Sequence, residues 1–201
     1  MNVELIQATP EPVNTISKIA SICYDSDPAD PIKLVKHLYK NGHHSVFEHI
    51  YFTFKIEGIS RACSHQLVRH RMCSFTQRSQ RYCNESDFKY VAPPSIGDNN
   101  PYDAMMSNIM EDYEDLLQVA PKEDARYILP NACCTDLYLS CNLRELIHIC
   151  NERLCVKAQW EIRELVEEMV ALVDKELRFM LVPKCKSGRI ICHTPCAMKG
   201  E

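Results

Sequence analysis

A run of basic side chains separated by neutral polar ones occupies the stretch RHRMCSFTQRSQRY, residues 69–82. It contains no Asp or Glu, although the chain has a net charge of -4, and its basic residues are Arg69, His70, Arg71, Arg78 and Arg81. Guanidinium groups bind oxyanions through paired N–H donors, and hydroxyls and amides between them add further hydrogen bonds. The stretch therefore predicts a site for a phosphate group.

Two alternatives stay open for this stretch. Arg69 and Arg71 end an expected helix, where cations offset the helix dipole, so the arginines can simply form a solvated basic surface. A nucleic-acid-binding module is the other alternative, and its binding would weaken steeply with salt. Only Phe75 and Tyr82 are available there for base stacking, and the acidic balance of the whole chain also argues against nucleic acid.

Cys73 lies inside the arginine run, where neighbouring cations can lower the pKa of a thiol and make it reactive. A cysteine nucleophile also needs a positioned base and an oxyanion site, and nothing flanking Cys73 indicates them. Because the chain has 12 cysteines, a small apolar filler is the better interpretation of any one of them. A cofactor-free cysteine enzyme is kept as an alternative, and it predicts that Cys73→Ala abolishes activity.

A second polar cluster lies in NLRELIHICNERL and comprises Asn142, Arg144, His148 and Arg153. Arg144 and His148 are four residues apart and share one face of an expected helix, which Asn142 can cap. Arg153 projects to a different side and would serve another site or a neighbouring subunit. The ordinary alternative is a solvated helix face in which Glu145 and Glu152 form ion pairs.

Two further segments raise the question of metal binding. GHHSVFEH, residues 42–49, contains His43, His44, Glu48 and His49, but their spacing matches no standard zinc motif. The polar tail, residues 183–201, offers soft ligands at irregular spacing, namely Cys185, Cys192, His193 and Cys196. We predict no metal at either segment.

Composition indicates an ordinary globular protein, with 46% hydrophobic and 25% charged residues in 201. A chain of this length can bury a sizeable core, and we expect a single domain over residues 1–201. No basic region followed by an apolar run opens the chain, and no apolar segment reaches transmembrane length. We therefore expect a cytoplasmic protein with reduced thiols.

Periodicity and caps predict the elements of the first third of the chain. VELIQA reads as a strand, Thr9-Pro10 as a helix start, and the segment from Asp30 to Gly42 as a second helix with both caps. Apolar residues alternate through HIYFTFKIEG, which predicts a strand with one buried face. Ser60 can cap the next helix, which we extend through RACSHQLVRHR.

The rest of the chain mixes helices and strands without strict alternation, which predicts an α+β fold. Residues 72–79 read as loop, followed by short strands at QRYC and FKYVAP. A long helix is expected after Asn100-Pro101 with Met105 and Tyr113 on its apolar face, then a helical piece near Pro121 and a strand at TDLYLSC. The last long helix is expected to contain Trp160 and extend to Leu181.

Taken together, the polar clusters resemble one family, the flavin-dependent thymidylate synthases (ThyX). The family signature is Arg-His-Arg, two residues, Ser, one residue, Asn, two residues, Ser, one residue and Arg. The residues that fit it are Arg69, His70, Arg71, Ser74, Ser79 and Arg81. Thr76 replaces the Asn, and because it offers one hydroxyl in place of a carboxamide, any flavin contact of that Asn is in question.

The other landmarks of the family occur in order, and the match extends from about residue 43 to 165. They are His43, Ser45, Glu48 and His49; Arg126 before Leu129-Pro130; Asn142 and Arg144; Arg153; and Ala158 to Ile162 as Ala-Gln-Trp-Glu-Ile.

The resemblance implies a ThyX-type α+β fold with an antiparallel sheet flanked by long helices. It implies a homotetramer whose active sites are shared between subunits. The implied reaction is the reductive methylation of dUMP to dTMP, with methylenetetrahydrofolate as carbon donor and NADPH-reduced FAD as hydride source. The family does not rely on a cysteine nucleophile, and the resemblance implies neither nucleic acid nor membrane as a partner.

Residue roles carry over by position. The dUMP ligands would be Gln66, Arg69, Gln77, Arg78, Ser79, Gln80, Arg81, Arg126 and Arg153. The FAD ligands would be Ser45, Arg69, His70, Arg71, Gln77, Asn142, Arg144 and His148. Arg153 and His43 are the expected catalytic residues: Arg153 would face the uracil and favour its ionised form, as a fixed cation beside developing negative charge, and His43 would lie near the folate entrance.

Overall fold

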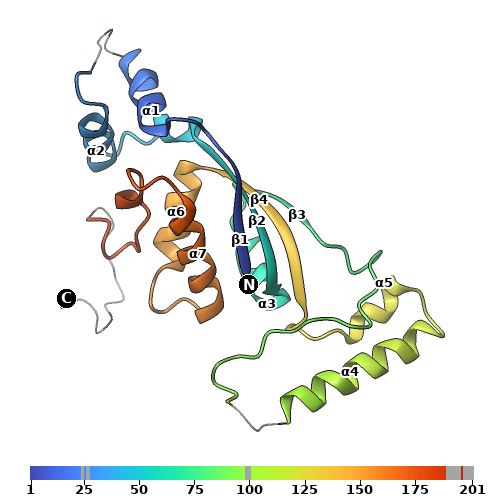
Figure 1. Cartoon of the computed structure of the whole chain (residues 1–201). Coiled ribbons are helices and arrows are strands. Elements are labelled where there is room, and N and C mark those ends of the chain that lie inside the picture. Colours follow the sequence, from blue (N-terminus) through green and yellow to red (C-terminus); the bar gives the residue numbers. More distant parts are fainter. Residues whose placement is uncertain (24, 26–27, 98–100, 189–195, 197–201) are drawn as a thin grey trace. The chain divides into compact units, whose positions relative to one another are not determined.

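The computed structural model describes residues 1–23, 25, 28–97, 101–188 and 196, and it divides into two compact units (Figure 1). The first unit contains residues 1–2, 56–69 and 75–138, and the second contains residues 3–55, 70–74 and 139–201. The single domain expected from the sequence stays a prediction.

A four-stranded sheet is formed by β1 (Asn2–Ala8), β2 (Tyr51–Ser60), β3 (Ser74–Gln77) and β4 (Cys134–Asn142) in the order β1-β2-β4-β3. Its strands are antiparallel, so the expected α+β fold with an antiparallel sheet is confirmed. In β2, Phe52 and Phe54 are buried while Tyr51 is 58% exposed. The alternation in the sequence thus gives one covered face and one open face.

The second unit holds α1 (Pro12–Ser21), α2 (Pro31–Asn41), the 3₁₀ helix η1 (Ser45–His49), α6 (Leu143–Arg153), α7 (Trp160–Leu172) and η3 (Arg178–Met180). Helix α1 packs on α2, and α6 packs on η1 and α7 (Figure 1). Side chains of α6 and α7 that contribute to the core of this unit include Leu146, Ile149, Ile162 and Leu165, none of which is exposed.

Predicted caps fix the ends of the helices in this unit. Asp30 accepts a hydrogen bond from the backbone N of Lys33 at 3.1 Å, and Gly42 ends α2 with φ 82, a left-handed conformation that suits glycine. Asn142 Oδ1 accepts from the backbone N of Glu145 at 2.9 Å and begins α6. Both helix starts are confirmed.

The first unit holds α3 (Arg61–Leu67), α4 (Tyr102–Leu117), α5 (Lys122–Ala125) and the 3₁₀ helix η2 (Arg126–Ile128). Ser60 caps α3, as predicted, by accepting from the backbone N of Cys63 at 3.0 Å. Phe88, Met106 and Cys133 form a buried cluster against which Tyr90 packs. Met106 lies in this core, and Tyr113 of the predicted apolar face of α4 is fully buried, but Met105, predicted on the same face, is 53% exposed.

Thr9 does not start a helix, because it extends the pairing of β1 with β2. Its backbone N donates to the carbonyl of Tyr51 at 3.0 Å, and its Oγ1 accepts from the backbone N of Tyr51 at 2.9 Å. Helix α1 therefore begins at Pro12, after Glu11, whose side chain makes no cap hydrogen bond.

Other element bounds also differ from the prediction. Helix α3 ends at Leu67, and α7 ends at Leu172 because the backbone of Val173 is extended. The residues expected as loop include β3, and the strands expected at QRYC and FKYVAP reduce to a bridge between Tyr90 and Cys133. Among the described residues, no helix is long and apolar enough to span a membrane.

Candidate active site

A cavity of about 640 Å³ in the second unit is lined by three of the predicted FAD ligands, Asn142, Arg144 and His148. Arg144 and His148 lie on the first two turns of α6, and Asn142, the last residue of β4, caps this helix. His44 and Glu48, from the segment between α2 and β2, line the same cavity. Two motifs far apart in the sequence therefore meet around one hollow.

An ion pair joins these two motifs. Nη1 of Arg144 donates to Oε1 of Glu48, and both side chains are about half exposed. His44 stacks on Tyr39 of α2 with ring centroids 5.7 Å apart, and Tyr39 also lines the cavity. The wall of the cavity thus combines a cation with a flat aromatic surface.

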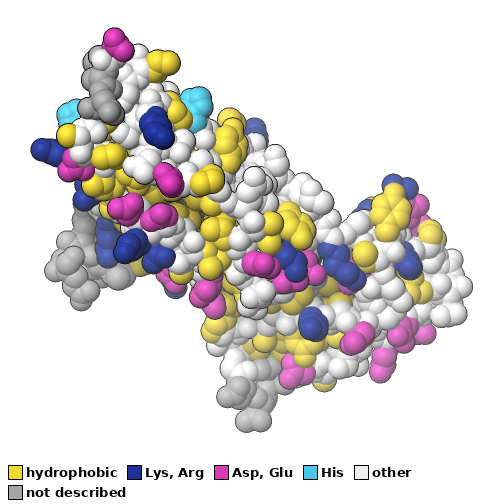
Figure 2. All heavy atoms as spheres, turned by 45° about the horizontal axis from the view of Figure 1, so that its top comes forward, with side chains coloured by type: hydrophobic (Ala, Val, Ile, Leu, Met, Phe, Trp, Pro, Cys, Tyr) yellow, Lys and Arg dark blue, Asp and Glu magenta, His cyan; other side chains and the backbone are white. Residues whose placement is uncertain are grey.

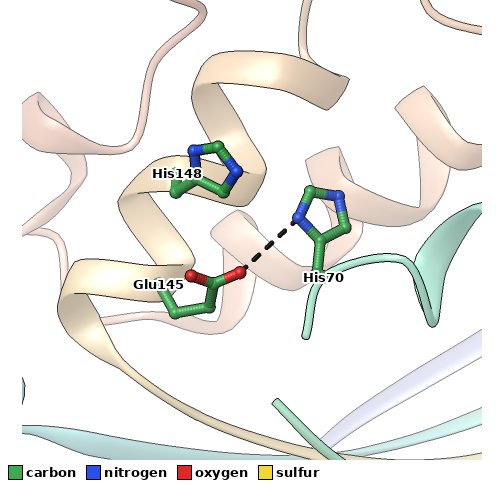
Figure 3. A group of neighbouring side chains, drawn as sticks. All are labelled: His70, Glu145 and His148. Atoms are coloured by element: carbon green, nitrogen blue, oxygen red, sulfur yellow. Dashed lines mark ion pairs between the residues drawn. The ribbon is translucent and has the colours of Figure 1, made fainter. Parts of the chain in front are cut away.

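His70 is buried beside α6 and contacts three of its side chains. Its Nε2 accepts from Nε of Arg153 at 3.0 Å, its Nδ1 lies 3.6 Å from Oε1 of Glu145, and its ring meets that of His148 edge to face at 5.5 Å (Figure 3). Burial, and then the charge of Arg153, lower the pKa of His70 to about 4. His70 is therefore neutral at physiological pH.

These contacts bear on two predictions for the α6 cluster. His70 contacts both Arg153 and His148, but Arg153 does not line the cavity that Arg144 and His148 share, so its service to another site or subunit stays a prediction. Glu145 is not on a solvated face, since it is 8% exposed and burial raises the pKa of its carboxyl. Glu152 does form the kind of surface ion pair expected, with Lys184 at 2.9 Å.

Asn151 of α6 lines the cavity with an acceptor that lacks a partner. The residue is 5% exposed, and its Nδ2 donates to the carbonyl of Ile147 at 2.7 Å. Its Oδ1 is buried and has no hydrogen bond within the described part of the chain. Such an acceptor is costly unless a bound group donates to it. Local sequence signals do not mark Asn151, because its burial depends on the packing of α6.

The predicted dUMP ligands other than Arg153 all lie in the first unit. The amide of Gln77 donates to the hydroxyls of Ser64 and Thr135 at 3.0 and 3.2 Å, and the amide of Gln80 donates to the sulfur of Cys133 at 3.6 Å. Burial raises the pKa of the Cys133 thiol to about 11. Side chains from α3, β4 and the residue before β4 thus accept hydrogen bonds from the two glutamines.

Acids oppose the arginines of the basic stretch. Nε of Arg78 donates to Oε1 of the buried Glu85 at 3.1 Å, and this hydrogen bond raises the pKa of Arg78. Arg81 pairs with Glu123, whose carbonyl also accepts from Nε of Arg126 at 3.0 Å. Basic and acidic side chains are interspersed on the face drawn in Figure 2. Acids thus pair with two of the four arginines of the stretch, Arg78 and Arg81.

A second cavity, of about 700 Å³, lies beside Arg78 in the first unit. Its lining includes the carboxylates of Glu57, Glu85, Asp87 and Asp136. This concentration of acids disfavours a phosphate inside that cavity. The contact between Arg78 and dUMP stays a prediction.

The remaining predicted residues are mostly accessible. Gln66 and Ser79 are half-buried, and Ser79 Oγ accepts from the backbone N of Arg81 at 3.2 Å. The exposed ones are His43, Ser45, Arg69 and Arg71. Thr76, which replaces the Asn of the signature, is exposed in β3. Their ligand contacts stay predictions.

Cys73 is half-buried next to Cys141 of β4, and a hydrogen bond between the two thiols, with burial, raises the pKa of Cys141. No general base is in this contact. The interpretation of Cys73 as a packing residue is consistent with this neighbourhood.

Within the described residues, neither segment considered for metal gathers three ligand atoms; the group that does is His70, Glu145 and His148, whose ligand atoms lie within 4.8 Å of one another. Cys192 and His193 of the tail lie outside the described residues.

Comparison with known proteins gives the family. Residues 4–177 match the model of the family described as thymidylate synthase complementing protein. The chain is 40% identical to a flavin-dependent thymidylate synthase of Geobacter sulfurreducens, over 86% of this chain and 82% of that one. This chain belongs to the flavin-dependent thymidylate synthase family. A relative in Pyrococcus furiosus is 41% identical, over 87% of this chain and 80% of its own.

Solved structures of the family share this fold. Thymidylate synthase X from Helicobacter pylori, crystallised with FAD and dUMP, superimposes with a TM-score of 0.78 at 25% identity, and covers 90% of this chain and 97% of its own. The resemblance read from the arginine signature is thereby confirmed, and so is the ThyX-type fold.

The cavity beside α6 fits the flavin cofactor that the family name implies. FAD carries a pyrophosphate, which a guanidinium such as that of Arg144 binds. It also carries N–H and O–H donors, one of which can satisfy the orphaned Oδ1 of Asn151. The half-buried ring of His44, stacked on Tyr39, adds a flat surface for a planar ring.

Proposed function

We propose that this protein converts dUMP to dTMP, with methylenetetrahydrofolate as carbon donor and NADPH-reduced FAD as hydride source. The observation that supports this most is the meeting of Asn142, Arg144 and His148 around one cavity in a chain that belongs to the flavin-dependent thymidylate synthases. Relatives crystallised with FAD and dUMP add to this support.

In this proposal, FAD binds the residues of the cavity beside α6. Arg144 offers its guanidinium to the pyrophosphate, and Asn151 accepts a hydrogen bond from the cofactor. Bound and reduced, the flavin would supply the hydride. Ser45, Arg69, Arg71 and Gln77 stay predicted ligands.

The nucleotide is bound by guanidinium and amide groups of the arginine signature, which suit a dianionic phosphate. Gln77 and Gln80 are held in place by hydrogen bonds, so little conformational entropy is lost when dUMP orders them. Arg153 faces the uracil and stabilises the negative charge that develops on the ring.

We further propose the homotetramer with shared active sites that the family resemblance implied. In such an assembly, different subunits contribute the residues of one site. Light scattering of the purified protein tests this directly: a mass of four chains supports it, and a monomer that is nevertheless active contradicts it.

The proposed function is tested by following the flavin under nitrogen. The purified protein should be yellow, release FAD on denaturation, lose its flavin absorbance with NADPH, and regain it after dUMP and methylenetetrahydrofolate are added. Arg153→Ala should take up FAD and fail to regain the absorbance. A colourless protein that also fails to bind added FAD would overturn the proposal.

A further inference from the structure

Arg153 ends α6 with its Nε directed at a histidine from a distant segment. Nε of Arg153 donates to Nε2 of His70 at 3.0 Å, and His70 is 5% exposed. The Nε–H bond lies in the guanidinium plane, so this bond fixes the plane and therefore the direction of both terminal amino groups.

The hydrogen bond determines the tautomer of His70. Nε2 can accept only if it carries no proton, so the proton of the neutral ring is on Nδ1. Nδ1 faces the carboxyl of Glu145 at 3.6 Å, and Glu145 is itself 8% exposed. That distance is too long for a strong hydrogen bond, but a nearby carboxyl oxygen favours the proton at Nδ1 electrostatically.

Burial and the neighbouring charges keep this ring neutral. Burial, then the charges of Arg153 and His148, lower the pKa of His70, and Glu152 raises it, with a net value of about 4. A protonated His70 would lose its acceptor and place two cations in contact.

The same three groups could instead hold a metal ion, since ligand atoms of His70, Glu145 and His148 lie within 4.8 Å of one another (Figure 3). A metal on Nδ1 of His70 would move the ring proton to Nε2, where it would meet the N–H of Arg153. Metal binding and the observed hydrogen bond therefore exclude each other, and the guanidinium also repels a cation.

We propose that His70 and Glu145 are positioning residues for Arg153: Glu145 selects the tautomer of His70, and His70 holds the guanidinium of Arg153 in the orientation that meets the uracil. This inference rests on the proposed function of Arg153, and it gives His70 a role in place of a direct flavin contact. It also explains why an acid is buried at this position of α6.

Kinetics of paired variants test the proposal. His70→Leu removes the acceptor, whereas His70→Gln can place an amide oxygen near the position of Nε2. We expect His70→Leu to lower kcat for dTMP formation by about ten- to a hundredfold, with FAD content and the KM for dUMP nearly unchanged. His70→Gln should recover most of kcat. Loss of FAD in His70→Leu would overturn the proposal and make His70 a flavin ligand.

A double-mutant cycle shows whether His70 acts through Arg153. If it does, His70→Leu should have no further effect on the residual rate of Arg153→Ala, and Glu145→Leu should lower kcat more than Glu145→Gln. Additive effects of His70→Leu and Arg153→Ala would contradict the proposal. His37→Gln, an exposed histidine of α2, serves as the control and should leave kcat unchanged.

¹⁵N NMR of protein labelled with ¹⁵N-histidine tests the contacts that link Glu145, His70 and Arg153, and it does not depend on enzyme activity. At pH 7 the signal assigned to His70 by its loss in His70→Gln should be that of a neutral ring with the proton on Nδ1. Glu145→Leu should increase the Nε2-protonated form. Any of three results would overturn the proposal, whether or not the enzyme forms dTMP. These are a charged His70 ring at pH 7, the opposite tautomer in the wild type, and a change in the ¹⁵N chemical shifts of His70 and His148 on titration with micromolar Zn²⁺.

Discussion

Arg144 of α6 and Glu48 of η1 form an ion pair at the wall of the cavity, and this pair connects two of the motifs that define the family. Both side chains are about half exposed, so the pair itself contributes on the order of 0–1 kcal/mol to the free energy of unfolding. Its consequence is geometric, because it keeps the guanidinium of Arg144 at the cavity.

Arg144→Ala should therefore weaken FAD binding far more than it destabilises the fold. A lost charge-assisted hydrogen bond to a phosphate corresponds to a roughly ten- to hundredfold higher Kd for FAD. Titration of the apoprotein with FAD and thermal unfolding measure the two effects. Arg163→Ala is the matched control, since Arg163 donates to the carbonyl of Val156 and does not line the cavity. An equal loss of FAD affinity in both variants would contradict the assignment of Arg144 as an FAD ligand.

Asn151→Leu tests the orphaned acceptor. Without ligand, the leucine should be tolerated or slightly stabilising, because it removes a buried acceptor that has no partner. With FAD, the variant should bind roughly tenfold more weakly, since the cofactor loses one hydrogen bond. The stabilisation by saturating FAD, followed as the shift of Tm, should shrink accordingly. An unchanged Kd for FAD would show that no group of the cofactor meets Asn151.

Cys73→Ala should keep at least half of the wild-type kcat. Cys73 is half-buried against the thiol of Cys141, and its removal leaves only a small cavity, which costs about 1 kcal/mol of stability. Steady-state assays and urea unfolding check the two values. Complete loss of activity in a folded, FAD-containing variant would instead favour a cysteine nucleophile.

His70 should make the protein less stable as the pH falls. Its pKa is about 4 when folded and 6.5 ordinarily, so the unfolded chain binds more protons between these values. This loss of stability is absent above pH 6.5. It grows as the pH falls toward 4 and reaches about 1–2 kcal/mol after allowance for solvent screening.

Urea unfolding at pH 7, 5.5 and 4.5 measures this dependence. Glu145 acts in the opposite direction, because burial raises the pKa of its carboxyl, so the comparison must be between the wild type and His70→Gln. The variant should lose less stability on acidification. If the wild type and His70→Gln lose equal stability on acidification, His70 does not have the lowered pKa that its burial predicts.

Local signals in the sequence were sufficient for much of the fold. The caps Asp30, Ser60 and Asn142 and the alternation of β2 each depend on a few neighbouring residues, and each was predicted correctly. Thr9 was predicted wrongly because a distant strand satisfies its hydroxyl and backbone. Strand β3 was missed because its Ser, Thr and Gln carry no apolar alternation.

In the candidate active site, too, the local features were predicted and those that depend on tertiary contacts were not. The spacing of Arg144 and His148 placed them correctly on α6, and Asn142 was placed correctly at its cap, since both signals are local. The burial of Glu145 and Asn151 could not be predicted, because it depends on tertiary packing around α6. The direction of Arg153 depends on His70, which a different segment supplies.

The central claim is tested most directly by following a labelled carbon. The FAD-containing protein is incubated under nitrogen with dUMP, NADPH and ¹³C-methylenetetrahydrofolate, and the nucleotide is analysed by mass spectrometry. We predict dTMP with the label in its methyl group, formed only when all three substrates are present. Unchanged dUMP after many hours, from a protein that holds FAD and is reduced by NADPH, would contradict the claim.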